Sequence, residues 1–120
     1  MLTAIHPKLP MRDKNKTLSY YLDGLGFTLL ADYGEYLLLV KDQIELHFFV
    51  HTSLLPGENA GGMYIRVNDI EKWYESLLYQ NIAIHPNGAL EEKPWGQKEF
   101  SLLDPDHNLL TFGETTHSIK

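Results

Sequence analysis

An apolar stripe with helical spacing is the first clear pattern in the chain. Its members recur at intervals of three and four residues, which places them on one face of an α-helix, and they are Leu18, Tyr21, Leu22 and Leu25. Asp13 stands where it can cap the start of this helix, and Gly24 and Gly26 stand where it can end. Residues 4–12, before the cap, have strand character. The pattern therefore predicts a strand followed by a helix.

Three short segments with the composition of β-strands come next. They span residues 27–32, 36–40 and 44–51. The breaks between them, at 33–35 and 41–43, are short enough for hairpins. The first half of the chain is thus predicted to run strand, helix, strand, strand, strand.

The second half repeats this order. Residues 63–67 read as a strand, and Asn68 with Glu71 forms a capping-box pattern. The apolar stripe of a second helix follows at Ile70, Trp73, Tyr74 and Leu77. The remaining predicted strands are residues 82–84, 99–103 and 109–112. A long loop at 87–96 carries Trp95 and is expected to be solvated at 91–93, and the polar tail at 114–120 is expected to fray.

The repeat predicts an α+β fold built from two βαβββ modules. The modules span about 1–52 and 61–114 of a single domain, 1–120, and a segment rich in Pro and Gly at 54–62 joins them. Each module would form a curved sheet with its helix on the convex face. The other face stays open, so we expect two modules to enclose a cavity.

Alternation along the predicted strands sorts the residues that would face this cavity. The inward set combines aromatic and polar side chains, and comprises His6, Glu45, His47, Phe49, Gly62, Tyr64, Arg66 and Thr111, with Tyr36 and Trp95 at the rim. Such a composition is typical of a ligand site. Packing of one subunit against another is the alternative, but apolar packing does not require so many Tyr, His and Trp.

Composition and charge narrow the function classes. The 120 residues carry a net charge of −6, which argues against nucleic acid as a partner. The chain has no cysteine, so disulfides and thiol chemistry are excluded. We find neither a signal peptide nor an apolar run long enough for a membrane span, and expect a cytoplasmic protein.

A segment near the C-terminus carries the most specific motifs. Pro94-Trp95-Gly96 precedes a strand, and Asp104-Pro105-Asp106 precedes another. With the duplicated βαβββ order, Leu25-Gly26-Phe27 and the strand 45–49, these motifs resemble the glyoxalase/bleomycin-resistance/dioxygenase superfamily, also called vicinal oxygen chelate proteins. The resemblance covers nearly the whole chain and is strongest to the bleomycin-resistance proteins, which are small homodimers that sequester antibiotics without chemistry.

The resemblance also implies where a metal would bind. Metal-using members place one ligand on each of four strands, and these positions fall on His6, Glu45, Gly62 and Thr111. Glycine offers no side-chain donor and threonine is a poor ligand, so His6 and Glu45 are only weak metal candidates. His47 shares a face with Glu45 and would complete a set of three. We expect no cofactor and no catalysis.

The bleomycin-resistance resemblance implies binding roles instead. Trp95 would stack on a flat part of the antibiotic, with Tyr36 on the other side and Tyr64 and His47 lining the groove. Trp95 packed on its own subunit as a loop anchor is the alternative. The full predicted ligand set adds residues from the strands and from the Asp-Pro-Asp turn, namely Phe49, Gly62, His107 and Thr111.

One departure from the family pattern and one match to it bear on this interpretation. His107 replaces the glycine usual after the Asp-Pro-Asp turn, so a non-glycine residue is expected at positive φ there. Pro7 matches a proline at which the first strand crosses to the partner subunit, which implies a homodimer with a swapped N-terminal strand. An ordinary edge-strand proline is the alternative.

The sequence therefore leaves three candidate functions. The first is sequestration of an aromatic, cationic antibiotic of the bleomycin class. The second is a metal-dependent enzyme of the same superfamily, of glyoxalase, thiol transferase or dioxygenase type, that uses His6, Glu45 and His47. The third is binding of an endogenous metabolite.

Overall fold

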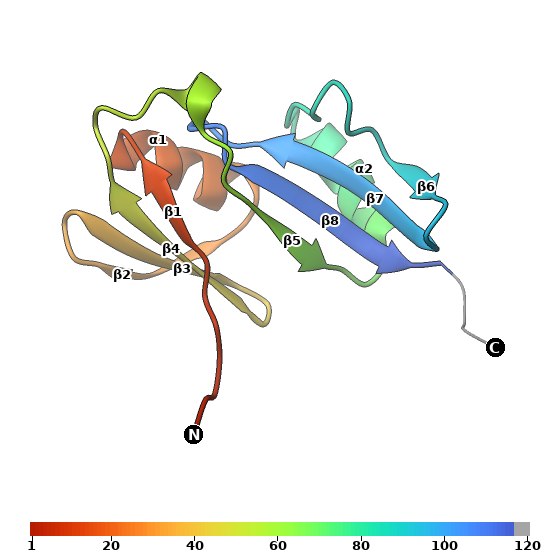
Figure 1. Cartoon of the computed structure of the whole chain (residues 1–120), viewed down its shortest axis with the longest axis horizontal. Helices are drawn as coiled ribbons and strands as arrows, with labels where there is room; N and C mark the ends of the chain where they lie inside the picture. The colour runs from red at the N-terminus through yellow and green to blue at the C-terminus, as the bar shows by residue number, and fades with distance from the viewer. Residues whose placement is uncertain (117–120) are drawn as a thin grey trace. The chain divides into compact units, whose positions relative to one another are not determined.

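A computed structural model describes residues 1–116, so part of the tail predicted to fray, including His117, lies outside the described residues. The chain divides into two compact units. The first unit comprises Met1–Gly61 with Pro105–Asn108, and the second comprises Gly62–Asp104 with the residues from Leu109 onward. Each unit has one helical segment and one four-stranded sheet (Figure 1).

The first unit has the predicted βαβββ order. Its elements are β1 (Lys8–Met11), α1 (Lys14–Leu18), a π-helical continuation (Ser19–Gly24), β2 (Thr28–Asp32), β3 (Tyr36–Lys41) and β4 (Ile44–Val50), and a 3₁₀ turn (Pro56–Glu58) follows. The sheet runs β1-β4-β3-β2, with β1 parallel to β4 and the other pairs antiparallel. As predicted, the Asp13 side chain caps α1 by accepting a hydrogen bond from the backbone N–H of Asn15.

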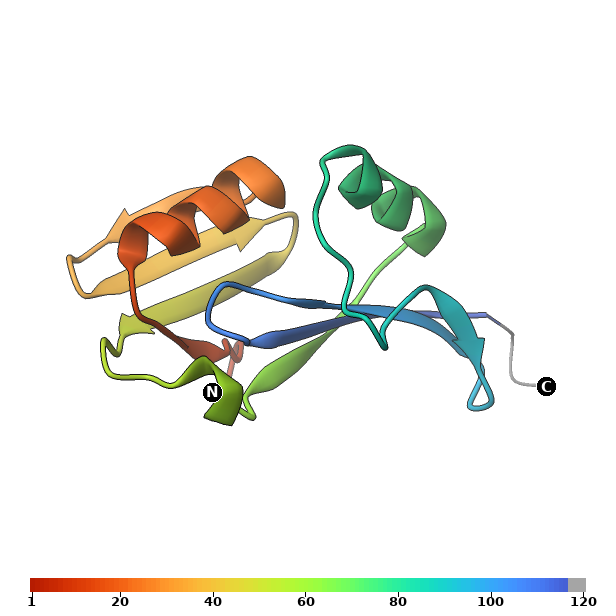
Figure 2. The same ribbon diagram turned by 90° about the horizontal axis from the view of Figure 1, so that it is seen from above.

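The core of the first unit lies between its sheet and its helix. Alternate residues of the strands are buried, namely Leu9, Met11, Leu37, Leu39, Leu46 and Phe48. Tyr21 and Leu25 of the predicted stripe are buried as well, and the Tyr21 ring lies 4.8 Å from the Phe48 ring. The helix runs along one face of the sheet (Figure 2). The opposite face carries Glu45, His47 and Phe49, as the alternation predicts.

The second unit repeats the topology. Its elements are β5 (Gly62–Arg66), α2 (Ile70–Tyr79), β6 (Glu91–Lys93), β7 (Gln97–Leu103) and β8 (Leu109–Thr115), in the sheet order β5-β8-β7-β6. Rings from helix and sheet meet in its core, where Tyr74 lies 4.9 Å from Phe100 and Trp73 lies 5.8 Å from Phe112. The α+β class with two βαβββ repeats is therefore confirmed. Among residues 1–116, no helix is long and apolar enough to cross a membrane.

Two strand predictions for this unit are wrong. Residues 82–84 form no strand, and the segment predicted as a solvated loop contains β6, whose Glu91 pairs with Glu99 of β7. Two backbone hydrogen bonds tie the connection before β6 to Ser101 of β7. His85 N–H donates to the Ser101 carbonyl, and Ser101 N–H donates to the Gly88 carbonyl. β6 is an edge strand that forms by backbone pairing with β7. It has no apolar pattern of its own from which it could have been predicted. The tail prediction also began too early, because β8 continues to Thr115.

The capping box predicted for the second helix is wrong too. The N-cap residue is Asp69, at φ 60°, and its side chain makes no capping bond. The carboxylate of Glu114, from β8, instead accepts hydrogen bonds from the backbone N–H groups of Asp69 and Ile70, each 2.9 Å long. These bonds, the one from Ile70 first, lower the pKa of Glu114. Glu71 is paired elsewhere, with Lys98 Nζ at 2.7 Å.

Candidate functional site

The open face of the first sheet carries a polar and aromatic cluster. Glu45 and His47 lie two residues apart on β4 and so point to the same side. Continuing the parallel register that pairs Lys8 with His47 places His6 opposite Glu45. On the other flank, Tyr36 of β3 pairs with Phe49. Adjacent strands thus bring together side chains that the sequence had assigned to one face.

Hydrogen bonds connect this first-unit cluster. His47 Nε2 lies 2.5 Å from Glu45 Oε2, and His47 Nδ1 lies 2.9 Å from the Tyr36 hydroxyl. His6 Nε2 lies 3.7 Å from the same Glu45 oxygen. Among residues 1–116, His6, Glu45 and His47 form the one group of three ligand-type side chains close enough to hold a metal ion. The two weak metal candidates and their possible third partner are therefore neighbours.

The open face of the second sheet is organised around one carboxylate oxygen. Oε2 of Glu99 accepts a hydrogen bond from the Tyr64 hydroxyl at 2.7 Å and another from Trp95 Nε1 at 3.1 Å. The Arg66 guanidinium lies over the Tyr64 ring, 5.2 Å from its centre, and also binds Gln97. Glu99 was missing from the sequence prediction. Alternation with buried Phe100 places it on this face and could have found it.

The Tyr64 side chain of β5 lies across β8 because β8 has a glycine, Gly113, at the point where the ring passes over it. A Cβ added to Gly113 would lie only 1.8 Å from the Tyr64 hydroxyl oxygen. Partial desolvation first, and then the hydrogen bond to the Glu99 carboxylate, raises the pKa of Tyr64. The phenol is protonated at neutral pH in any case, and it donates its proton to Glu99. The face therefore presents a fixed phenol and a fixed carboxylate.

Trp95 lies at the tip of the hairpin that joins β6 to β7. Gly96, at φ 76°, closes the turn by donating its N–H to the carbonyl of Lys93. The indole is 63% exposed, and its Nε1 is held by Glu99. A tryptophan with its nitrogen anchored and its ring in solvent can stack on a planar ligand. The exposure disfavours the alternative of an anchor packed within the unit.

The two remaining superfamily metal positions offer no ligand. A Cβ added to Gly62 would lie 2.8 Å from the Leu109 carbonyl oxygen, so the close pairing of β5 with β8 leaves little room for a side chain. Thr111 pairs with Tyr64 across the strands, and its hydroxyl lies 3.2 Å from the Ser101 hydroxyl. The second unit therefore contributes neither of its two expected ligands.

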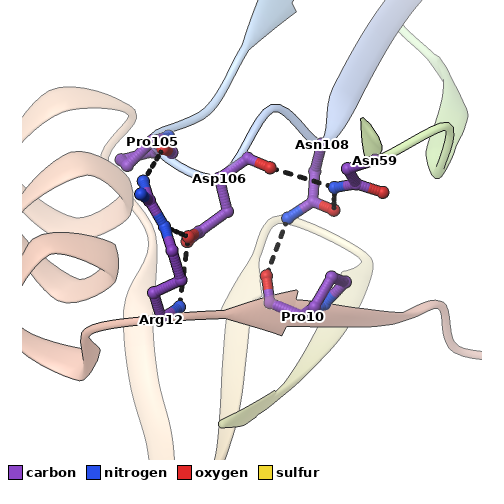
Figure 3. Close-up of polar contacts among 6 residues, drawn as sticks. All are labelled: Pro10, Arg12, Asn59, Pro105, Asp106 and Asn108. Carbon is purple, nitrogen blue, oxygen red and sulfur yellow. Dashed lines mark hydrogen bonds and ion pairs between the residues drawn. The ribbon is translucent and has the colours of Figure 1, made fainter. Parts of the chain in front are cut away.

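The turn that carries His107 is bound to β1. Figure 3 shows Asp106 accepting hydrogen bonds from the Arg12 backbone and from Arg12 Nε, at 3.1 and 2.7 Å. Asn108 donates to the Pro10 carbonyl and accepts from Asn59. His107 itself is exposed and has φ 63°, which confirms the predicted positive φ. The sequence reasoning missed this network, whose role is to hold the turn.

The N-terminal arm precedes β1 and is largely exposed. The apolar side chains of Leu2 and Ile5 are almost fully in solvent. Pro7 ends the arm, and its carbonyl accepts a hydrogen bond from His47 N–H at 3.0 Å. The proline thus stands at the point where the exposed arm meets the sheet of the first unit.

Comparison with known proteins confirms the resemblance. The glyoxalase-like domain model matches residues 5–117. A bleomycin resistance protein of Geobacillus stearothermophilus is 28% identical over 130 residues, covering 93% of this chain and 96% of that protein. The structure of a bleomycin-binding protein complexed with bleomycin is 27% identical with a TM-score of 0.85, covering 95% of this chain and 99% of that one. A bleomycin resistance determinant encoded on a transposon is 26% identical with a TM-score of 0.87, covering 97% and 100%.

Proposed function

Because the chain belongs to the glyoxalase-like domain family, we propose that it binds and sequesters an aromatic, cationic antibiotic of the bleomycin class without chemistry. The observation that carries the proposal is the likeness, over nearly the full length of both chains, to a protein whose structure holds bleomycin. The metal-dependent enzyme of the same superfamily is less well supported, since Gly62 and Thr111 stand at two of its four ligand positions.

The face of the second sheet supports this function. Trp95 presents an exposed ring for stacking, and Glu99 fixes both the indole and the Tyr64 hydroxyl. The net charge of −6 favours approach of a cationic ligand. We propose as ligand-contacting residues Glu99 together with the eight predicted from the sequence, which are Tyr36, His47, Phe49, Gly62, Tyr64, Trp95, His107 and Thr111.

Titration with metal-free and copper-loaded bleomycin tests the proposal. We expect one ligand per chain by calorimetry, with quenching of tryptophan fluorescence. Loss of a stacking partner costs about 1–3 kcal/mol, so Trp95→Ala should weaken binding roughly 5- to 150-fold. Trp73, which is half-buried on α2 with its ring against Phe112, remains as a fluorophore in this variant.

Tyr79→Ala is the matched control, since Tyr79 is an exposed aromatic residue on α2. It should leave the affinity unchanged. If the wild-type chain binds neither form of bleomycin, sequestration of this antibiotic is wrong and a metabolite ligand becomes the better hypothesis. Binding that is unchanged in Trp95→Ala would refute the stacking role alone.

We further propose a homodimer whose N-terminal arm, ending at Pro7, crosses to the partner subunit. The exposed apolar side chains of Leu2 and Ile5 support it, since a second copy would remove them from water. Light scattering should give twice the chain mass of 13.8 kDa, and Leu2→Asp with Ile5→Asp should shift the population toward the monomer. Leu78→Asp, at an exposed position of α2, is the control.

We also propose that the protein is located in the cytoplasm. Fractionation of cells that express the tagged chain tests it, and recovery in the membrane or secreted fraction would contradict it.

A further inference from the structure

We infer that the open face of the second sheet selects planar cations over planar uncharged molecules, and that Glu99 is the residue that sets this preference. The inference deepens the proposed function and rests on it for the stacking role of Trp95. It assigns a separate task to each of two neighbouring side chains, which is stacking for the indole and charge recognition for the carboxylate. Both residues belong to the second unit.

The β6–β7 hairpin places Glu99 beside Trp95. Glu99 points to the open face because the next residue of β7, Phe100, is buried in the core. The hairpin turn brings the indole close enough for Trp95 Nε1 to donate to Glu99 Oε2 at 3.1 Å. Since an indole N–H lies in the plane of its ring, the carboxylate sits at the edge of the indole and leaves the faces of the ring clear for stacking.

The Glu99 carboxylate keeps one oxygen available for a ligand. Its Oε2 accepts hydrogen bonds from the Tyr64 hydroxyl and from the Trp95 indole. Among residues 1–116, Oε1 has no hydrogen bond and the carboxylate has no ion pair. In the same part of the chain, no buried side-chain nitrogen or oxygen atom lacks a hydrogen-bond partner, so Oε1 is open to solvent. Glu99 therefore presents a negative charge that no cation of the described residues pairs with directly.

The neighbouring charged groups on this face are already engaged. Glu91, which pairs with Glu99 across the strands, forms an ion pair with Lys93. The Arg66 guanidinium binds Gln97 and lies 5.2 Å from the centre of the Tyr64 ring, which shows a cation resting on an aromatic ring of this face.

The Trp95 ring is left for the ligand. It is 63% exposed, and no ring or cation of residues 1–116 stacks on it. A flat, positively charged heteroaromatic group can stack on this indole while its charge lies beside the Glu99 carboxylate. An uncharged ring of the same shape gains the stacking alone. Because neither interaction needs a hydrogen-bond donor on the ligand, the pair of residues recognises a ring and its charge rather than a particular functional group.

Thioflavin T and its uncharged analogue, which lacks the methyl group on the thiazole nitrogen, test the inference because they differ mainly in charge. We expect the full chain to bind thioflavin T more tightly than the analogue in equilibrium dialysis. Glu99→Gln keeps an acceptor oxygen and removes the charge, so it should weaken thioflavin T binding roughly 2- to 5-fold and leave binding of the analogue unchanged. Trp95→Ala should weaken binding of both probes, by roughly 5- to 150-fold.

Glu91→Gln is the matched control, because it removes an equal charge from the cross-strand neighbour of Glu99. The Glu91 side chain is 63% exposed and already paired with Lys93, so its loss should leave the preference for thioflavin T unchanged. Equal affinity of the unmodified chain for the two probes, or no binding of thioflavin T, would overturn the inference. An equal loss of affinity for both probes in Glu99→Gln would overturn it as well, since Glu99 would then only position the indole.

These results are distinguishable from those on the antibiotic. Bleomycin binding combined with equal affinity for the two probes would support sequestration and refute charge selection by Glu99. A preference for thioflavin T without bleomycin binding would refute sequestration of this antibiotic and support charge selection.

Discussion

Replacing Glu114 by glutamine removes the anion that caps the N-terminus of α2. The carboxylate accepts two backbone hydrogen bonds, from Asp69 and Ile70, each 2.9 Å long. A glutamine side chain keeps one acceptor oxygen, loses the other and loses the negative charge at the positive end of the helix. Loss of a capping bond costs about 0.5–2 kcal/mol and loss of the charge about 0.3–1 kcal/mol. We expect Glu114→Gln to lower the free energy of unfolding by roughly 1–2 kcal/mol.

Urea denaturation followed by circular dichroism measures this change, and Tm should fall by about 4–8 °C. The effect should also depend on pH in a defined direction. Because the hydrogen bonds lower the pKa of Glu114 below its ordinary value of 4.5, the stabilisation is complete above about pH 4.5. It is lost as the pH falls through the lowered pKa, so the wild type and Glu114→Gln should converge in stability at still lower pH.

Glu75→Gln supplies the control, since it removes the same charge from an exposed position in the middle of α2. Its effect should stay within about 0.5 kcal/mol. A loss in Glu114→Gln no larger than in Glu75→Gln would refute the capping role. A difference between wild type and Glu114→Gln that persists unchanged at acid pH would refute the charge as its cause.

Three further predictions concern the second sheet. Glu99→Gln should lower the pKa of Tyr64, because it removes a carboxylate that favours the protonated phenol. Ultraviolet titration of the tyrosines measures this decrease, and an unchanged Tyr64 pKa would contradict the role of the carboxylate. Gly113→Ala should displace the Tyr64 side chain, seen as altered chemical shifts of its ring, whereas an unmoved ring contradicts the 1.8 Å clash. Gly62→Ala should destabilise the chain by about 1–3 kcal/mol, since its Cβ would lie 2.8 Å from the Leu109 carbonyl oxygen, and unchanged urea denaturation would show that the strands have room.

The candidate site shows which of its residues could be predicted from the sequence pattern and which could not. Alternation on β4 placed Glu45 and His47 on the open face, and that assignment needs only the local geometry of a strand. Glu99 was not assigned from the pattern, although the same rule applies to its strand. Its importance comes from a shared hydrogen bond with Trp95 and Tyr64, which depends on the β6–β7 turn and on the pairing of β8 with its neighbours.

By itself the sequence determined the α+β class, the repeated order of strands and helices, and the face on which most candidate residues lie. Those features follow from the spacing of apolar side chains, with a period of about 2 residues in strands and about 3.6 in helices. Each segment carries this spacing independently of the rest of the chain. Tertiary structure alone decided that Glu114 caps α2, that β6 forms at Glu91–Lys93, and that His6 lies beside Glu45. The physical reason is that these contacts join segments distant in the chain, so they exist only once strand register and helix position are set.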